Sequence, residues 1–323
     1  MRPLALAGIA GLLMTLAIPA ALAGETASEW LERMSAAMGQ MTYQGTFVYI
    51  QGDDVQTMHI THLADENGTR ERLVSVSGPH REVVRDAKGV RLFSGDKRGG
   101  LADPAINRPI FFELPISDAA SASDSYEFRL LGGQRIAGHS SRRLDISPRD
   151  GYRYGHSLWL DQQSGLLLQW KLLGPGGEDL ARLMFTELKI GSEVDPEALR
   201  GSGDSADRRS RPSALPAEGL AGSRQPEWAP ASLPPGFHLA SHRSPGDTGS
   251  DRFEHLVYSD GIAAVSVYIE ERSHNPDRPA GLKRMGTAHA YFRALDDLFV
   301  TVVGDVPEAT VKLIGEAVRP VQP

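Results

Sequence analysis

The sequence predicts an α+β protein: an antiparallel sheet, curved or partly closed into a barrel and packed on one helix, precedes a smaller C-terminal α+β domain. Short apolar segments recur between turn signals up to residue 190, at the roughly 8–12-residue spacing of an antiparallel sheet. Residues 28–40 place Trp30, Leu31, Met34 and Met38 at helical spacing, which predicts the helix. Residues 191–225 contain no aromatic side chain and divide the sheet from the second unit.

The first unit reads as the helix followed by a succession of strands. Residues 42–51 form the first of them and are apolar on both faces, whereas 97–108 are polar and glycine-rich and predict a surface loop. Turn signals such as Asn67-Gly68 separate the segments. Further strands are expected at 55–62, 70–77, 81–85, 89–93, 126–131, 134–137, 140–147, 155–160, 166–173 and 179–190.

The most apolar pair of strands is the predicted hairpin at 155–173, with residues 161–165 as its turn. A five-residue turn would place Leu160 opposite Leu166, Leu158 opposite Leu168, and His156 opposite Trp170. Alternate side chains share a face of a strand, so one face collects leucines and a tryptophan. Each fully buried leucine contributes about 1.5–3 kcal/mol. This face must therefore be covered, either by protein or by a ligand.

Residues 191–225 are rich in Gly, Ser, Pro, Arg and Asp, and predict a flexible linker. In the second unit, residues 251–270 predict a hairpin with a type I′ turn at Asp260-Gly261. That turn would place Tyr258 opposite Ala263 and Leu256 opposite Val265. A strand at 298–303 and a helix at 307–318 complete a small α+β domain.

The N-terminus carries the pattern of a secretory signal. Arg2 precedes an apolar run that Pro19 interrupts, and Ala21-Leu22-Ala23 forms a cleavage site of the A-x-A kind. An uncleaved anchor helix is the alternative, because the run approaches the length that spans a bilayer. The expected organisation is a signal peptide at 1–23, a β-domain at 24–190, the linker at 191–225 and the small domain at 226–323.

Composition narrows the class of function. The formal net charge of −7 argues against a general nucleic-acid binder, which needs a basic surface. The absence of cysteine excludes disulfides, zinc–thiolate sites and a thiol nucleophile. Gly155-His156-Ser157 resembles the start of a nucleophile elbow, but the serine lies inside a predicted strand and the second glycine is replaced by Trp159. We expect no enzyme, cofactor or metal site, with an exported hydrolase built on Ser157 and His156 as a minor alternative.

The surplus of apolar surface on the first sheet has two explanations. One helix covers one face of a curved sheet, so the other face could line a hydrophobic cleft. Alternatively, residues 104–115, which include Ile106, Ile110, Phe111 and Phe112, fill that space. The pattern leaves both open.

Several separated segments resemble one known family, and they occur in the family's order: 78–85 (GPHREVVR), 149–154 (RDGYRY), 158–161 (LWLD) with 164–166 (SGL), 233–237 (LPPGF), 258–261 (YSDG) and 303–307 (VGDVP). The chain resembles the RseB/MucB family of periplasmic negative regulators of the envelope-stress sigma factor. Two departures are a longer, more Arg/Ser-rich linker and Leu167, which stands where the family often has proline.

The resemblance implies a fold and a partner. The large domain should be similar to the lipoprotein carriers LolA and LolB, an unclosed antiparallel β-barrel over a helix. The protein should lie in the periplasm, bind the periplasmic part of a membrane-spanning anti-sigma factor of the RseA/MucA type, and shield it from the protease that begins its degradation. Lipids or lipopolysaccharide fragments should release it. A lipid or lipoprotein carrier is the alternative, and the oligomeric state, homo-oligomers included, stays open.

Two sets of residues are candidates for these contacts. The candidates for lipid binding are Phe47, Tyr49, Leu158, Leu160, Leu168 and Trp170. The candidates for partner binding are Tyr258, Tyr268, Arg272 and Tyr291.

Overall fold

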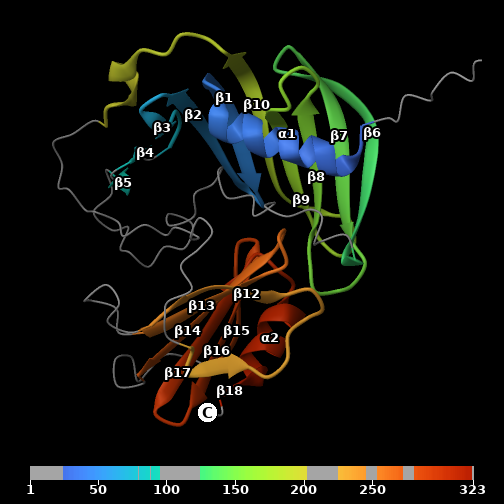
Figure 1. Ribbon diagram of the computed structural model, residues 1–323, viewed down its shortest axis with the longest axis vertical. Coiled ribbons are helices and arrows are strands. Elements are labelled where there is room, and N and C mark those ends of the chain that lie inside the picture. Colours follow the sequence, from blue (N-terminus) through green and yellow to red (C-terminus); the bar gives the residue numbers. More distant parts are fainter. Residues whose placement is uncertain are drawn as a thin grey trace, which may run out of the picture.

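A computed structural model describes residues 25–78, 80–87, 89–94, 124–201, 225–244, 253–271 and 280–321. The predicted signal peptide, the 97–108 loop, the 104–115 segment, Arg272 and most of the predicted linker lie outside these residues. The predicted fold class is confirmed: an open antiparallel sheet lies over one helix, and a smaller α+β domain follows (Figure 1). The bounds of the four units stay a prediction.

The large domain begins with α1 (Ala27–Gln40) and contains ten strands in one sheet. Their order is β5-β4-β3-β2-β1-β10-β9-β8-β7-β6, so β5 and β6 are its edges. The strands are β1 (Tyr43–Gln51), β2 (Asp54–Asp65), β3 (Gly68–Ser75), β4 (Arg81–Asp86), β5 (Gly89–Ser94), β6 (Tyr126–Ile136), β7 (His139–Pro148), β8 (Gly155–Asp161), β9 (Leu167–Leu173) and β10 (Asp179–Ile190).

The sheet is strongly curved. The ring of His139 on β7 lies 3.2 Å from the carbonyl oxygen of Leu188 on β10, although β8 and β9 separate these strands in the sheet order. Such a contact requires the β6–β7 end of the sheet to bend back toward the central strand β10, as in a partly closed barrel. A 3₁₀ helix at Pro196–Leu199, inside the predicted flexible linker, follows β10 and buries Leu199.

Helix α1 lies across one face of this sheet (Figure 1). Thr26 caps it through a capping box with Glu29, which satisfies two of the free amide groups at the helix start. Arg33 fixes the helix to the β8–β9 turn by donating to the carbonyl oxygens of Gln162 and Gln163 at 3.2 and 3.3 Å. The buried side of α1, with Trp30, Leu31 and Met34, packs on leucines of β7 and β8.

The predicted register of the β8–β9 hairpin is wrong. Leu158 pairs with Trp170 rather than with Leu168, and His156 pairs with Leu172, because the register shifts at Trp159 and Leu160. The turn explains the error. One side-chain oxygen of Asp161 accepts hydrogen bonds from Ser164 and from the amide of Gln163, which forms a compact Asx-type turn.

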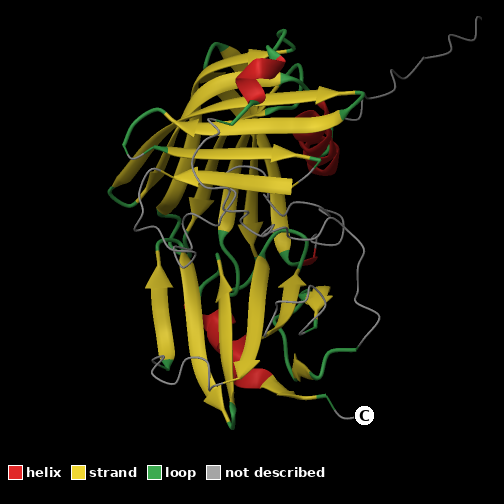
Figure 2. Cartoon of the chain, turned by 90° about the vertical axis from the view of Figure 1, so that its left-hand side faces the viewer, coloured by secondary structure: helices red, strands yellow, loops and turns green. Residues whose placement is uncertain are grey.

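The small domain has a six-stranded antiparallel sheet in the order β12-β13-β14-β17-β16-β15. Helix α2 (Glu308–Ala317) covers one face of it, and Figure 2 looks onto the opposite face. The strands are β12 (His238–Arg243), β13 (Phe253–Ser259), β14 (Ala264–Glu271), β15 (Gly281–Met285), β16 (Ala288–Leu295) and β17 (Leu298–Gly304). A two-stranded sheet of β11 (Trp228–Pro230) and β18 (Val318–Pro320) lies beside them. The sequence patterns did not predict β11, β15, β16 or β18.

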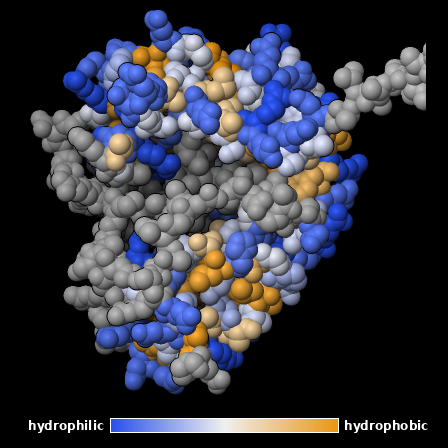
Figure 3. Space-filling model, in the orientation of Figure 1, coloured by the Kyte–Doolittle hydropathy of each residue, from blue (hydrophilic) through white to orange (hydrophobic). Residues whose placement is uncertain are grey.

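The surface differs between the domains. In the view of Figure 3, mostly hydrophilic residues cover the large domain, whereas hydrophobic residues gather over the small domain below the junction. Among the residues that the structure describes, no helix is long and apolar enough to cross a lipid bilayer.

Candidate functional site

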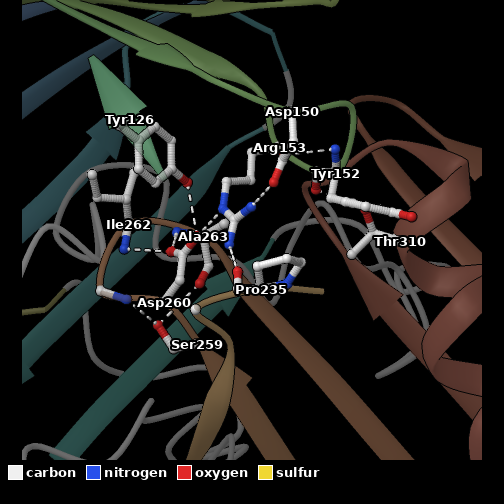
Figure 4. Close-up of polar contacts among 12 residues, drawn as sticks. Tyr126, Asp150, Tyr152, Arg153, Pro235, Ser259, Asp260, Ile262, Ala263 and Thr310 are labelled. Atoms are coloured by element: carbon white, nitrogen blue, oxygen red, sulfur yellow. Dashed lines mark hydrogen bonds and ion pairs between the residues drawn. The ribbon is translucent and has the colours of Figure 1, made fainter. Parts of the chain in front are cut away.

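The junction between the two domains is built around a buried arginine. Arg153 lies in the turn between β7 and β8, and its side chain is completely buried. The guanidinium forms ion pairs with Asp150 of the same turn and with Asp260 of the small domain, and it donates to the carbonyl oxygen of Pro235 (Figure 4). Thus one side chain of the large domain binds two segments of the small domain.

Aromatic rings complete the arginine's surroundings. The guanidinium lies 4.9 Å from the ring centre of Phe237 and 5.5 Å from that of Tyr126, within the range of cation–π attraction. The Tyr126 hydroxyl donates to Asp260 at 3.0 Å. Burial alone would lower the pKa of Arg153, but the hydrogen bond and the charge of Asp260 raise it above its ordinary value. The charged form is therefore the stable one here.

Asp260 shapes its own loop with its second oxygen. Its Oδ1 accepts hydrogen bonds from the amides of Ile262 and Ala263 at 2.9 and 2.7 Å, while Oδ2 binds Arg153 and Tyr126. This makes a four-residue loop instead of the predicted two-residue turn. As a result Tyr258 pairs with Val265 rather than Ala263, and the predicted register of this hairpin is wrong.

The loop also inserts an apolar side chain into the large domain. Ile262 is almost fully buried and belongs to the same cluster as Trp30 and Leu31 of α1 and Tyr126 of β6. Because α1 packs on that cluster, the helix and the small domain share one apolar core. A change at the junction therefore reaches α1 through direct contacts.

Three polar contacts surround the junction. The Thr310 hydroxyl at the start of α2 donates to the carbonyl oxygen of Tyr152 at 2.6 Å. The Gln51 amide donates to the Thr287 hydroxyl at 2.9 Å. The Tyr154 hydroxyl lies 3.2 Å from Nδ1 of His289. These contacts come from several elements of each domain, so they fix orientation as well as distance.

The predicted lipid-binding residues lie in the core beneath α1. Phe47, Leu158, Leu160 and Leu168 are completely buried, and Tyr49 and Trp170 are partly buried. Leu158 and Leu160 share a cluster with α1, whereas Phe47 and Leu168 belong to the neighbouring cluster, which includes Ala37. A lipid that used these side chains would have to enter between the sheet and the helix. Their role in lipid binding stays a prediction.

His156 and Trp170, predicted to lie opposite each other, are instead joined by a hydrogen bond between their side chains. Trp170 donates from its indole nitrogen to Nδ1 of the buried His156 at 3.1 Å. Burial lowers the pKa of His156 to about 4, so the ring is neutral near pH 7 and keeps this acceptor.

The predicted partner-binding residues separate into two environments. Tyr258 is buried and Tyr291 is partly buried, both in the core under α2. Tyr268 lies on the other face of the sheet, where its ring stacks on His255 at 4.3 Å. Arg272 lies outside the described residues. Partner binding by any of the four stays a prediction.

The hydrolase interpretation receives no support from the local geometry. Ser157 donates its hydroxyl hydrogen to Asp145 at 2.7 Å, while its neighbour His156 points to the other face of β8 and binds Trp170. In the small domain, Ser244 and Glu254 both lie beside the same nitrogen of His242, at 3.5 and 2.9 Å. A catalytic triad needs the two groups on different ring nitrogens.

A second buried polar cluster lies at the C-terminal end of α1. Tyr43 on β1, His62 on β2, Glu71 on β3 and Arg85 on β4 are cross-strand neighbours on the sheet face that α1 covers. The Tyr43 ring stacks on His62 at 4.6 Å, and Nδ1 of His62 lies 2.8 Å from the Met41 carbonyl oxygen. Burial raises the pKa of Glu71 to about 8, although the charge of Arg85 opposes the shift.

This cluster predicts a pH-dependent stability. The folded protein keeps the Glu71 proton up to about pH 8, whereas the unfolded chain loses it near the ordinary glutamate value. Stability is thus lost as pH rises. We expect the free energy of unfolding to fall by about 1–2 kcal/mol between pH 6.5 and 8. Glu71→Gln should abolish that fall, and Glu127→Gln, on the exposed side of β6, should retain it. Urea denaturation at each pH tests this, and a flat wild-type profile would contradict it.

Within the described residues, no group of three or more His, Asp or Glu side chains is arranged to hold a metal ion. The fold and the junction define a two-domain protein in which a helix-covered open sheet and a small α+β domain share a buried, charge-paired interface. Its most specific features are contacts between domains.

The chain belongs to the MucB/RseB family. Residues 26–202 match the MucB/RseB N-terminal domain and residues 222–319 match the MucB/RseB C-terminal domain. Similar proteins include the sigma factor AlgU regulatory protein MucB of Pseudomonas aeruginosa, 34% identical over 99% of this chain and 98% of that protein. The sigma-E factor regulatory protein RseB of Haemophilus influenzae is 26% identical over 91% of each chain.

Solved structures show the same relationship. The complex of Pseudomonas aeruginosa MucA and MucB matches with a TM-score of 0.70 at 31% identity, over 92% of this chain and 99% of that one. MucB in complex with MucA(peri) matches with a TM-score of 0.68 at 30% identity, over 92% of this chain and 100% of that one. Three of the segments that carry the family resemblance, 149–154, 233–237 and 258–261, meet at Arg153.

Proposed function

We propose that this protein is a periplasmic regulator that binds the periplasmic part of a membrane-spanning anti-sigma factor of the MucA/RseA type. The observation that carries the proposal is the match to MucB, a protein solved in complex with MucA, across both domains. The relatives MucB and RseB are named as regulatory proteins of sigma factors.

The finer part of the proposal concerns the consequence of binding. The bound protein shields the anti-sigma factor from the protease that begins its degradation, and lipid binding to the large domain releases it. A lipid can release the partner only if it binds the partner-free state more tightly. The apolar core shared by α1 and Ile262 supports this link, because a lipid that displaced α1 would disturb the junction.

The test is a binding and protection assay with the purified periplasmic segment of the cognate anti-sigma factor. We expect the protein to retain the segment in a pull-down and to slow its cleavage by the cognate protease. Adding lipopolysaccharide fragments should reverse both effects. Failure to bind the segment, with or without lipid, would overturn the proposal. Binding without protection would limit it to partner recognition.

A further inference from the structure

Two polar side chains, Tyr43 and Glu71, lie buried side by side in the part of the large domain that the structure describes. The Tyr43 hydroxyl is completely buried and has no partner within the described part of the chain. Glu71 is 4% exposed, and among the described residues the charge of Arg85 acts on its carboxyl group. Leaving a buried polar group unsatisfied costs about 1–3 kcal/mol, so each such group needs an explanation.

The two groups belong to one site. Tyr43 and Glu71 are both cross-strand neighbours of His62, on opposite sides of it, and the Tyr43 ring leans over the His62 ring. Burial raises the pKa of Tyr43 most, and ionised Glu71 would raise it further, so the carboxyl group lies close enough to act on the hydroxyl. Arg85 lies opposite Glu71 on the next strand and acts on its carboxyl group.

The protonation states define what this site would accept. Near pH 7 both Tyr43 and Glu71 carry their protons, because burial raises the pKa of each. Burial also lowers the pKa of His62, which favours a neutral ring. The site therefore offers two O–H donors beside the positive charge of Arg85. That combination suits an oxygen anion with a single negative charge.

The surroundings suit an acyl chain. Ile60 and Leu73 are the next inward-facing residues on β2 and β3, and both are buried in the same apolar cluster as Tyr43. This cluster continues to Phe47 and Leu168, two of the predicted lipid-binding residues. A molecule with an apolar chain and an acidic end matches both halves of the site.

We propose that Tyr43 and Glu71 form a seat for the acidic head group of an acyl lipid, a carboxylate or a singly charged phosphate, whose chain lies along the apolar cluster beneath α1. This inference rests on the lipid binding that is part of the proposed function. The head group accepts a hydrogen bond from the unsatisfied Tyr43 hydroxyl and a second one from protonated Glu71. The lipid chain takes the place of packing contacts of α1.

The experiment measures the affinity of the full-length mature protein for oleate, for oleoyl lysophosphatidic acid and for the uncharged monoolein. Wild type should bind the two acidic lipids at least about tenfold more tightly than monoolein. Tyr43→Phe should remove about that preference, whereas Tyr291→Phe, which removes a hydroxyl in the small domain, should not change it. The tighter of the two acidic lipids identifies the head group.

A pH series tests whether Tyr43 and Glu71 bind a lipid head group or hold only a buried water molecule. Glutamine keeps a donor hydrogen, so Glu71→Gln should bind oleate like wild type at pH 7 and more tightly than wild type at pH 9. Glu71→Leu should bind weakly at both. If wild type binds none of the lipids, the lipid part of the proposed function fails. If wild type binds the acidic lipids but Tyr43→Phe binds them equally well, the proposed head-group site is wrong. If Tyr43→Phe in addition lowers stability, the hydroxyl holds only a water molecule.

Discussion

Arg153→Ala is expected to lower the free energy of unfolding by about 3–5 kcal/mol, the usual effect of removing one partner of a buried ion pair. The substitution leaves Asp260 buried without its cation and removes the donor to the Pro235 carbonyl oxygen. Asp150 is less affected, because it is partly exposed. Denaturation in urea, followed by circular dichroism, measures the loss.

Arg129→Ala is the matched control, because Arg129 is an exposed arginine on β6. Its effect should stay within about 0.5 kcal/mol. The double variant Arg153→Ala/Asp260→Ala should lose much less than the sum of the two single losses, since each single change already breaks the same pair. A loss below about 1 kcal/mol for Arg153→Ala would mean that water replaces the guanidinium and that the pair does not hold the domains.

The fold could be predicted from the sequence wherever one local rule decided the structure. The helical spacing around Trp30 and Leu31 located α1, and turn residues located most strands of the large sheet. Both hairpin registers were wrong for one reason. Asp161 and Asp260 use their side-chain oxygens to satisfy turn amides, and this lengthens or reshapes a turn in a way that residue types alone do not show.

The site was less predictable, because it depends on contacts far apart in the sequence. An arginine in a polar turn reads as a surface residue, yet Arg153 is buried by Asp260, 107 residues away. The available signal was the family resemblance, whose motifs at 149–154 and 258–261 contain both partners. Strands β15 and β16 escaped prediction because Lys283, Arg284 and His289 interrupt their apolar pattern.

Ile262→Asp is expected to separate the two domains. Ile262 is 1% exposed and packs with Trp30, Leu31 and Tyr126 of the large domain. An aspartate there would be a buried charge without a partner, beside Asp260, and would lose the apolar contacts, which together should weaken the junction by about 3–5 kcal/mol. Since each domain has an apolar core of its own, we expect a larger radius of gyration in small-angle X-ray scattering and two thermal transitions instead of one.

The conservative control Ile262→Val removes one methylene group, should cost only about 0.5–1.5 kcal/mol and should keep the domains together. Leu282→Asp introduces the same charge at an exposed position of the small domain and should leave the scattering unchanged. If the partner binds across both domains, Ile262→Asp should also bind the anti-sigma segment more weakly, because the fixed orientation would be lost. Unchanged affinity together with separated domains would confine recognition to a single domain and leave the junction with a purely structural role.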